Sequence, residues 1–150
     1  LYALPGDFPG KSSVEWTRQR TGTDKANLIE VELTRDINRH NFIPYIQVHE
    51  FEALLFVKPK HFAKWADDVI ANKFCAIAAT TAPEDINDHP ASAPSKRILA
   101  AMPDYQKPFH GPLIACDTGL DAMRAACPHY AGWLDKLDRL TDQRTEEITV

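Results

Sequence analysis

The sequence predicts an α/β domain that is rich in helices and has few strands. Apolar residues recur at helical spacing in three segments, which follow Asp24, Pro59 and Thr118. Residues 42–48 (FIPYIQV) are instead β-branched and aromatic, which is typical of a buried strand. With 150 residues, of which 44% are hydrophobic and 25% charged, the chain can form one domain with a real core.

Two helices are expected before this strand. The serine pair at residues 12–13 can cap a short helix that runs through residues 16–20, and residues 21–23 (TGT) interrupt it. From Asp24 onward, the apolar spacing predicts an amphipathic helix of roughly four turns. Polar residues at 38–41 end that helix.

The strand itself leads directly into good helix formers. Pro44 favours an edge position or the start of the strand, because proline cannot donate a backbone hydrogen bond to a neighbouring strand. Residues 51–56 (FEALLF) then read as helix. Residues 49–56 (HEFEALLF) therefore lie at a predicted strand-to-helix junction.

The C-terminal half is expected to alternate helices with loops. Proline, glycine and short polar residues mark the loops, and apolar stripes mark the helices. The expected elements are a helix from Pro59 to residue 70, a long surface loop at 80–95, a short helix at 95–102, a loop at 102–112, a helix capped by Thr118 and Asp121, and a helix that restarts at Pro128 and frays after Thr141.

Composition excludes several classes of protein. The formal net charge of −4 provides no global basic field for nucleic acid, although a local basic patch is compatible with it. The three cysteines, an odd number without CxxC spacing, indicate buried reduced thiols rather than a disulfide framework or zinc site. Since no apolar run approaches the ~20 residues that span a bilayer and no export signal is visible, we expect a cytoplasmic protein that is not in a membrane.

Residues 49–56 place acids directly against apolar residues, which is costly unless something compensates the charge. The motif is not a zinc-protease helix, because Ala53 stands where the second histidine is needed. On a strand Glu50 and Glu52 would share a face, whereas on a helix Glu52 would neighbour His49. Either arrangement can hold a hard divalent cation such as Mg²⁺. The alternative is that both acids occupy a first helical turn, where the macrodipole favours them by about 0.3–1 kcal/mol.

Residues 94–97 (PSKR) form a candidate phosphate cradle. If Ser95 caps a helix, Lys96 and Arg97 fall in its first turn, where the helix dipole disfavours cations. A helix N-terminus flanked by two cations suits a bound phosphate. The alternative is a pair of exposed cations, or an ion pair with the acids of the preceding loop.

Other polar motifs carry less information. Lys107 and His110 either join the same anion site or are surface residues. Residues 83–88 (PEDIND) favour turns and caps over a calcium loop, because the glycine and the closing glutamate of such a loop are absent.

Six motifs stand in one order along the chain: LPGDFPGK, IPYIQVHEFEALLF, PEDIND, APSKRI, YQKPFHG and GLDAMRAACPHYAGWL. In this order they resemble the bacterial family catalogued as domain of unknown function 4276. The resemblance implies a TOPRIM-like fold, the Mg²⁺-dependent fold of topoisomerases, primases and overcoming-lysogenization-defect nucleases.

The resemblance also implies a function. It suggests a Mg²⁺-dependent nuclease-type domain that acts on phosphodiesters of a nucleic acid, in phage defence and with an ATPase partner. The implied residues are Glu50, Glu52 and His49 for the metal, Glu50, Glu52 and His110 for catalysis, and Lys96, Arg97 and Lys107 for phosphate. The rival interpretation is a non-catalytic binding or regulatory module for an ATPase or a nucleotide, which the acidic net charge favours.

Residues 1–150 are expected to form a single domain, and a fragment of the family's full domain. The chain starts at Leu1 rather than methionine, and its first residues (LYALPGDFPGK) read like a loop in mid-sequence. The resemblance implies that an N-terminal strand–helix part, which carries further acids in the family, is lacking.

Overall fold

The computed structural model describes residues 4–86, 89 and 91–148, and every secondary-structure element in these ranges is a helix. The elements are the α-helices α1 (Val14–Arg18), α2 (Gly22–Ile37), α3 (Asp68–Ala78), α4 (Pro94–Ala101), α5 (Lys107–Thr118), α6 (Leu120–Ala126) and α7 (Pro128–Ile148), and the 3₁₀ helices η1 (Phe51–Val57), η2 (Pro59–Lys64) and η3 (Pro83–Asp85). The described chain is therefore all-α, and the prediction of a TOPRIM-like α/β fold is wrong.

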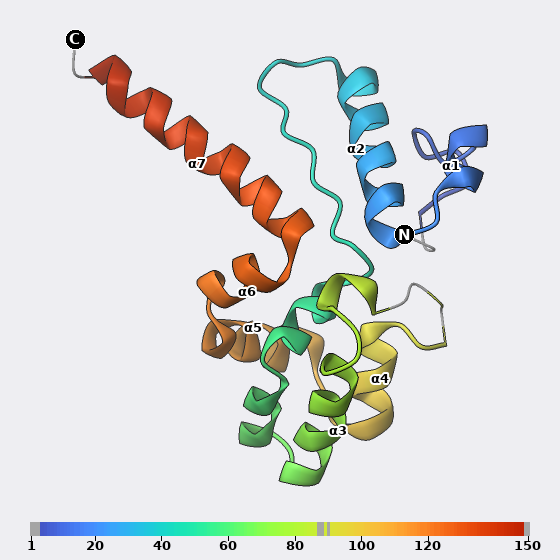
Figure 1. Cartoon of the computed structure of the whole chain (residues 1–150), viewed down its shortest axis with the longest axis vertical. Coiled ribbons are helices and arrows are strands. Elements are labelled where there is room, and N and C mark those ends of the chain that lie inside the picture. The colour runs from blue at the N-terminus through green and yellow to red at the C-terminus, as the bar shows by residue number, and fades with distance from the viewer. Residues whose placement is uncertain (1–3, 87–88, 90, 149–150) are drawn as a thin grey trace.

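The correction rests on the segment of residues 42–48, which runs extended between α2 and α7 without pairing with a strand (Figure 1). The backbone N–H of Ile46 donates to Glu30 Oε1 at 2.8 Å, and its carbonyl oxygen lies 3.2 Å from His129 Nε2. A strand is defined by a hydrogen-bonded neighbour, and among the described residues side chains of two helices take that place. The β-prone residues of this segment thus adopt an extended backbone without forming a sheet.

The first two helices follow their local signals. Ser13 caps α1 by accepting from the backbone N–H of Trp16. Thr21 and Asp24 form a capping box at the start of α2, which begins two residues earlier than expected. Asn38, in the left-handed conformation with φ of 46°, ends α2.

Residues 51–78 also depart from the expected pattern. The expected α-helix from Pro59 is divided into the 3₁₀ helix η2 and the α-helix α3, which Asp67 caps. The FEALLF segment forms the 3₁₀ helix η1. Its five residues from Glu52 to Phe56 are all buried, so tertiary packing decides its conformation.

The predicted loop at 102–112 is largely helix. Helix α5 begins at Lys107, and Pro112 lies inside it. Pro108 lies in the first turn, where the missing N–H of a proline costs nothing. Pro112 removes one intrahelical hydrogen bond, and burial of Ile114 in the core stabilises the helix despite this loss. Thr118 ends this helix rather than capping the next one, since its Oγ1 donates to the carbonyl of Ile114 at 2.8 Å. At the C-terminal end, α7 continues to Ile148 instead of fraying after Thr141.

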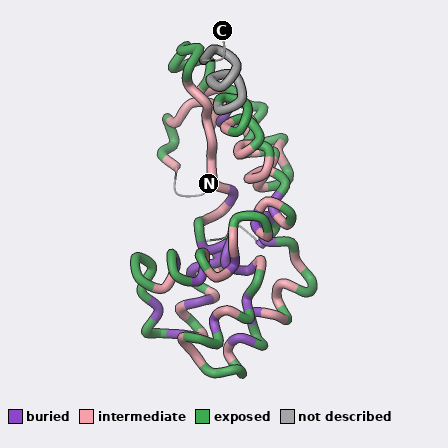
Figure 2. The backbone as a smooth tube through the Cα atoms, turned by 90° about the vertical axis from the view of Figure 1, so that its left-hand side faces the viewer, coloured by how far each residue is buried: buried purple, intermediate pink, exposed green. Residues whose placement is uncertain are grey.

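The main core lies among η1, η2, α3, α4 and α5. Phe56, Phe62 and Phe74 are fully buried there, with ring centroids 4.7–6.4 Å apart. Figure 2 shows buried residues gathered in this part of the molecule, whereas residues 128–140 of α7 are exposed or half-buried. The N-terminal end of α7 is held by hydrogen bonds of His129 and Tyr130 to other elements.

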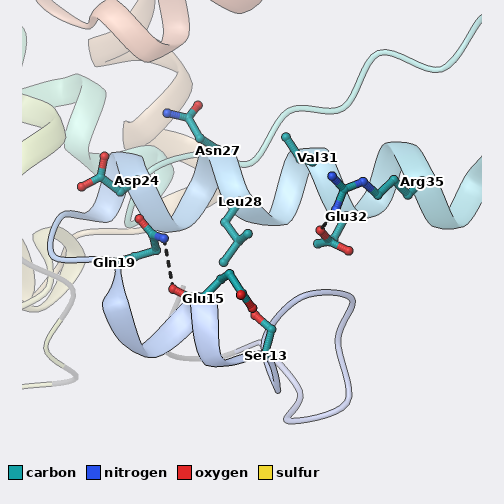
Figure 3. A pocket seen from close by; sticks show the side chains of 9 residues that line it. All are labelled: Ser13, Glu15, Gln19, Asp24, Asn27, Leu28, Val31, Glu32 and Arg35. Carbon is teal, nitrogen blue, oxygen red and sulfur yellow. Dashed lines mark hydrogen bonds and ion pairs between the residues drawn. The ribbon is translucent and has the colours of Figure 1, made fainter.

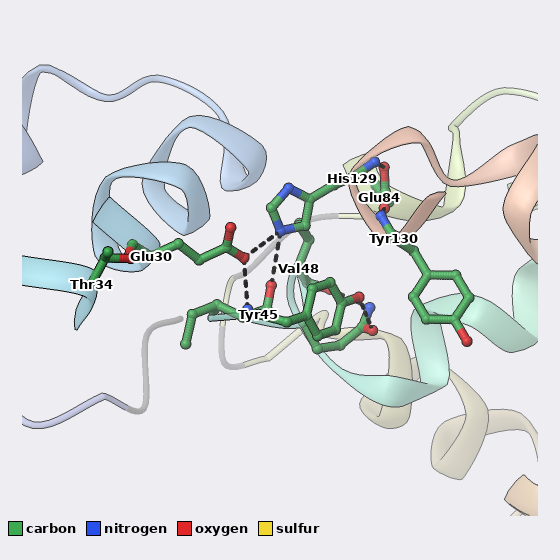
Figure 4. A network of polar contacts seen from close by, with 9 residues as sticks. Glu30, Thr34, Tyr45, Val48, Glu84, His129 and Tyr130 are labelled. Carbon is green, nitrogen blue, oxygen red and sulfur yellow. Dashed lines mark hydrogen bonds and ion pairs between the residues drawn. The ribbon is translucent and has the colours of Figure 1, made fainter. Parts of the chain in front are cut away.

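A carboxylate from a distant element caps that end of α7. Glu84, in η3 and only 5% exposed, accepts the backbone N–H groups of His129 and Tyr130, each at 3.0 Å (Figure 4). Helix N-termini leave N–H groups without intrahelical partners and carry partial positive charge. One buried carboxylate here satisfies two of these groups.

A buried ion pair joins α7 to α2. His129 Nε2 lies 2.9 Å from Glu30 Oε1, and the histidine ring stacks on Tyr45 at 5.5 Å between centroids (Figure 4). The hydrogen bond with Glu30 raises the pKa of His129 against the opposing effect of burial, and the charges of Glu30 and Glu84 add to the increase. The raised pKa means that the folded state favours the imidazolium form.

Replacing Glu84 with alanine should destabilise the protein by about 2–3 kcal/mol, because two buried N–H groups at the start of α7 lose a charged acceptor. Urea unfolding followed by circular dichroism measures the change. Asp85→Ala, which removes the exposed neighbouring acid, is the matched control and should change the free energy of unfolding by less than about 0.5 kcal/mol. Equal effects of the two variants would contradict the capping role.

The His129–Glu30 pair predicts a pH dependence of stability. Because the folded pKa of His129 is raised above 6.5, the pair stabilises the fold fully below that ordinary value. This contribution is lost as pH rises through the folded pKa. Unfolding midpoints measured from pH 6 to pH 9 should therefore fall more steeply in the wild type than in Glu30→Gln, which retains an acceptor for Ile46 but removes the charge. Parallel profiles would refute the pairing.

Candidate functional site

Glu50 reaches the start of a helix that lies 45 positions later in the chain. Its Oε2 accepts the backbone N–H of Ser95 at 2.8 Å, in the first turn of α4. The residue at the N-cap position of α4 is Ala93, whose side chain cannot accept a hydrogen bond. Glu50 thus takes the role that the sequence assigned to Ser95, and it does so from a distant segment.

Glu50 is ionised at neutral pH. Burial by itself would raise its pKa, but hydrogen bonds from Ser95 and the charges of Lys107 and Lys96 outweigh that effect and lower the pKa below 4.5. The carboxylate therefore lies within the field of two lysines from two different helices. From the sequence, acids of residues 49–56 and the later lysines were only candidates for one shared site.

Glu52 lies in the first turn of η1 and is only 3% exposed. Its Oε1 is 3.1 Å from Nζ of Lys107, the first residue of α5, whose side chain is half-exposed. A buried carboxylate needs a compensating charge, and Lys107 supplies it. Because the side chain of Lys107 is half-exposed, Lys107 can exchange partners more easily than a buried group.

We call Glu50, Glu52, Lys96 and Lys107 the acid–lysine cluster. Lys107 links its two acids, because it pairs with Glu52 and its charge also acts on Glu50. Lys96, which is exposed on α4, acts on Glu50 as well. The structure therefore brings together four of the residues singled out in the sequence, from η1, α4, α5 and the segment before η1.

The other three candidates have different surroundings. Arg97 donates from Nε to the carbonyl of Ser92 at 2.7 Å and so braces the loop before α4. His110 accepts the backbone N–H of Gln106 on Nδ1 at 2.8 Å and stacks on Tyr105. The ring of His49 packs against α2, where a Cβ at position 22, occupied by glycine, would come within 2.6 Å of its Cε1.

Tyr105 belongs to the cluster's surroundings and was not identified from the sequence. It is 5% exposed, and its hydroxyl makes no hydrogen bond. Burial raises the pKa of this hydroxyl, and the charges of Glu52 and Glu50 raise it further. The sequence carried no signal for this role, because Tyr105 stands in a proline-rich segment that reads as a loop.

The donor set of the cluster suits a hard cation. Among the described residues, no group of three or more histidine, cysteine, aspartate or glutamate side chains is arranged to hold a metal ion. Glu50 and Glu52 provide two carboxylates, and Mg²⁺ is commonly held by one or two carboxylates together with waters and substrate phosphates. The cluster is therefore compatible with Mg²⁺ that a substrate helps to bind. His49 is not part of such a group.

A separate cleft of about 610 Å³ lies between α1 and α2 (Figure 3). Three of its four charged lining residues have local partners, since Glu32 pairs with Arg35 and Asp24 caps α2. None of the residues predicted to bind metal or phosphate or to act in catalysis lines it. Of the other acidic motif, PEDIND, Glu84 caps α7, whereas Asn87 and Asp88 lie outside the described residues.

Comparison with known proteins provides one match. A family model described as "Domain of unknown function (DUF4276)" matches residues 2–138. No curated protein and no solved structure matches the chain. In the described ranges, none of the helices combines the length and apolar character needed to traverse a bilayer.

Glu50 predicts a loss of stability in acid. Because its folded pKa is lowered, it stabilises the fold above its unfolded pKa, and this contribution is lost as pH falls through the folded pKa. Glu50→Gln keeps an acceptor for Ser95 but does not titrate. The difference in unfolding free energy between wild type and Glu50→Gln should therefore shrink from pH 6 to pH 3. A constant difference between wild type and Glu50→Gln over this pH range would contradict the assignment.

Proposed function

The chain belongs to the DUF4276 family, and we propose that its acid–lysine cluster binds phosphodiesters and cleaves them with Mg²⁺, as a nuclease-type site. One observation carries the proposal. Two carboxylates from one short segment meet lysines from two helices, with Lys107 beside Glu52 and both lysines acting on Glu50. Phosphoryl transfer needs carboxylate oxygens for a metal and cations for phosphate oxygens in one place.

Each residue of the cluster has a defined task in this proposal. Glu50 and Glu52 would hold Mg²⁺, and Mg²⁺ when bound supplies Lewis-acid stabilisation of the charged phosphate. Lys96 and Lys107 neutralise non-bridging oxygens, for which their exposed ammonium groups are available. Lys107 exchanges its partner Glu52 for the substrate phosphate, which frees a buried carboxylate for the metal.

His110 is proposed to stabilise the leaving oxygen with a hydrogen bond from Nε2, as water attacks the phosphorus and the leaving oxygen takes its proton from solvent. Its Nδ1 accepts a backbone N–H, so the neutral ring carries its proton on Nε2. Trp65 and Phe109 contact the ring edge-on, at 5.3 and 5.0 Å between centroids, and limit its orientation. A ring with a defined tautomer and orientation is suited to donating a hydrogen bond to an oxygen on which negative charge develops.

A second candidate is a non-catalytic module that binds a nucleotide or an ATPase partner. The observation that favours it is that both acids already have structural partners, since Glu50 caps α4 and Glu52 pairs with Lys107. In this case the lysines contact the phosphates of a bound nucleotide or the acidic surface of the partner. The two candidates differ in the ligand that the cluster binds and in whether the ligand is cleaved.

Glu52→Gln should lower Mg²⁺-dependent cleavage of single- or double-stranded DNA or RNA on the order of 100-fold, because it removes a charge from the metal site while preserving side-chain volume. Cleavage by purified protein is measured on gels with Mg²⁺ or Mn²⁺, with and without an ATPase partner. Urea unfolding of the variant establishes that it is folded.

Glu15→Gln removes an exposed acid far from the cluster and is the matched control, with an expected rate equal to that of the wild type. Nucleotide binding without cleavage by the wild type would favour the binding module. An absence of both binding and cleavage would refute the proposed function.

A further inference from the structure

The hydroxyl of Tyr105 is a buried polar group that makes no hydrogen bond within the described chain. Tyr105 is 5% exposed and belongs to the main core, where its ring stacks on His110 at 5.7 Å between centroids. Its Oη is shielded from solvent and has no hydrogen-bond partner. Buried tyrosine hydroxyls usually find a partner, and a phenylalanine would fill the same space without the cost of an unmade bond.

The surroundings of this hydroxyl place it at the acid–lysine cluster. The charges of Glu52 and Glu50 both act on Tyr105. Helix α5 approaches it closely, because a Cβ at Gly111 would lie 3.2 Å from Oη and also 3.2 Å from the ring of Phe51, which stands between Glu50 and Glu52 in the chain. Gly111 follows Lys107 by one helical turn, so the hydroxyl lies beside the first turns of α5 and the segment that carries both acids.

Neither of the two carboxylates whose charges act on this hydroxyl accepts a hydrogen bond from it. Glu50 accepts from Ser95, and Glu52 is paired with Lys107. The O–H of a protonated phenol is satisfied by an acceptor oxygen, and a metal cation cannot accept it. At a site that binds phosphodiesters, the incoming acceptor would be a phosphoryl oxygen.

We propose that Tyr105 is a further ligand-binding residue of the acid–lysine cluster, and that its hydroxyl donates a hydrogen bond to an oxyanion of the ligand, such as a phosphoryl oxygen. The inference rests on the proposed function and refines it, because it requires an anionic ligand rather than a metal ion alone. The half-exposed side chain of Lys107 is the part of the cluster that moves to admit this oxygen. Its ammonium then follows the anion away from Glu52.

The test is Tyr105→Phe, with two measurements on the whole chain. Urea unfolding should show a stability equal to or greater than that of the wild type, since no bond is lost in the free protein. Binding of a fluorescein-labelled oligothymidylate with Mg²⁺, followed by anisotropy at fixed salt, should weaken by about tenfold. If Tyr105 had only a structural role, Tyr105→Phe would not weaken binding while leaving stability intact.

Tyr45→Phe is the matched control. The hydroxyl of Tyr45 is 2.7 Å from Gln47 Oε1, in the separate network beside α7. Its removal should lower stability and leave oligonucleotide binding unchanged.

Three results would overturn the inference: a loss of stability in Tyr105→Phe like that in Tyr45→Phe, unchanged binding by Tyr105→Phe, or no binding by the wild type. Failure of the proposed nuclease activity is distinguishable from these. If the wild type binds the oligonucleotide in a Tyr105-dependent manner and never cleaves it, the role of Tyr105 stands and the catalytic proposal falls.

Discussion

The hydrogen bond from a backbone N–H to the carboxylate of a distant glutamate is the interaction on which the described structure depends. Glu30 accepts from Ile46, Glu50 from Ser95, and Glu84 from both His129 and Tyr130. No β-sheet joins the described segments. These bonds therefore connect distant parts of the chain, as hydrogen bonds between neighbouring strands do in a sheet. Bonds to an ionised acceptor are stronger than neutral ones, so a few of them can fix the register of helices against loops.

Only one of the two acids in the candidate site makes such a bond to a distant backbone N–H, so their roles differ. Glu50 is committed to α4, and by holding the start of that helix it also positions Lys96. Glu52 is buried with only a half-exposed lysine as its ion-pair partner. Of the two, Glu52 is therefore the acid whose environment a ligand can change. Structural capping and a phosphate site are compatible here, because the capping bond orients the carboxylate and its neighbours in advance.

Much of the candidate site could be recognised from the sequence, but its geometry could not. Acids beside apolar residues pointed to Glu50 and Glu52, because burial of charge always requires a partner. Which partner each acid found depends on contacts between residues about 45 or more positions apart. For the same reason nothing in the sequence indicated the hydrogen bond by which Arg97 braces its own loop, and Tyr105 was missed because its surroundings come from other segments.

What the sequence by itself determined is the local beginning and end of α1 and α2. Ser13, Thr21 with Asp24, and Asn38 act within four residues of themselves, so neighbours in the chain suffice to define their bonds and dihedral angles. Only the tertiary structure decided that residues 42–48 remain an unpaired extended segment and that α5 forms across Pro112. Both outcomes depend on groups supplied from far along the chain, the side chains of Glu30 and His129 in one case and a shared core in the other, and no local pattern encodes those encounters.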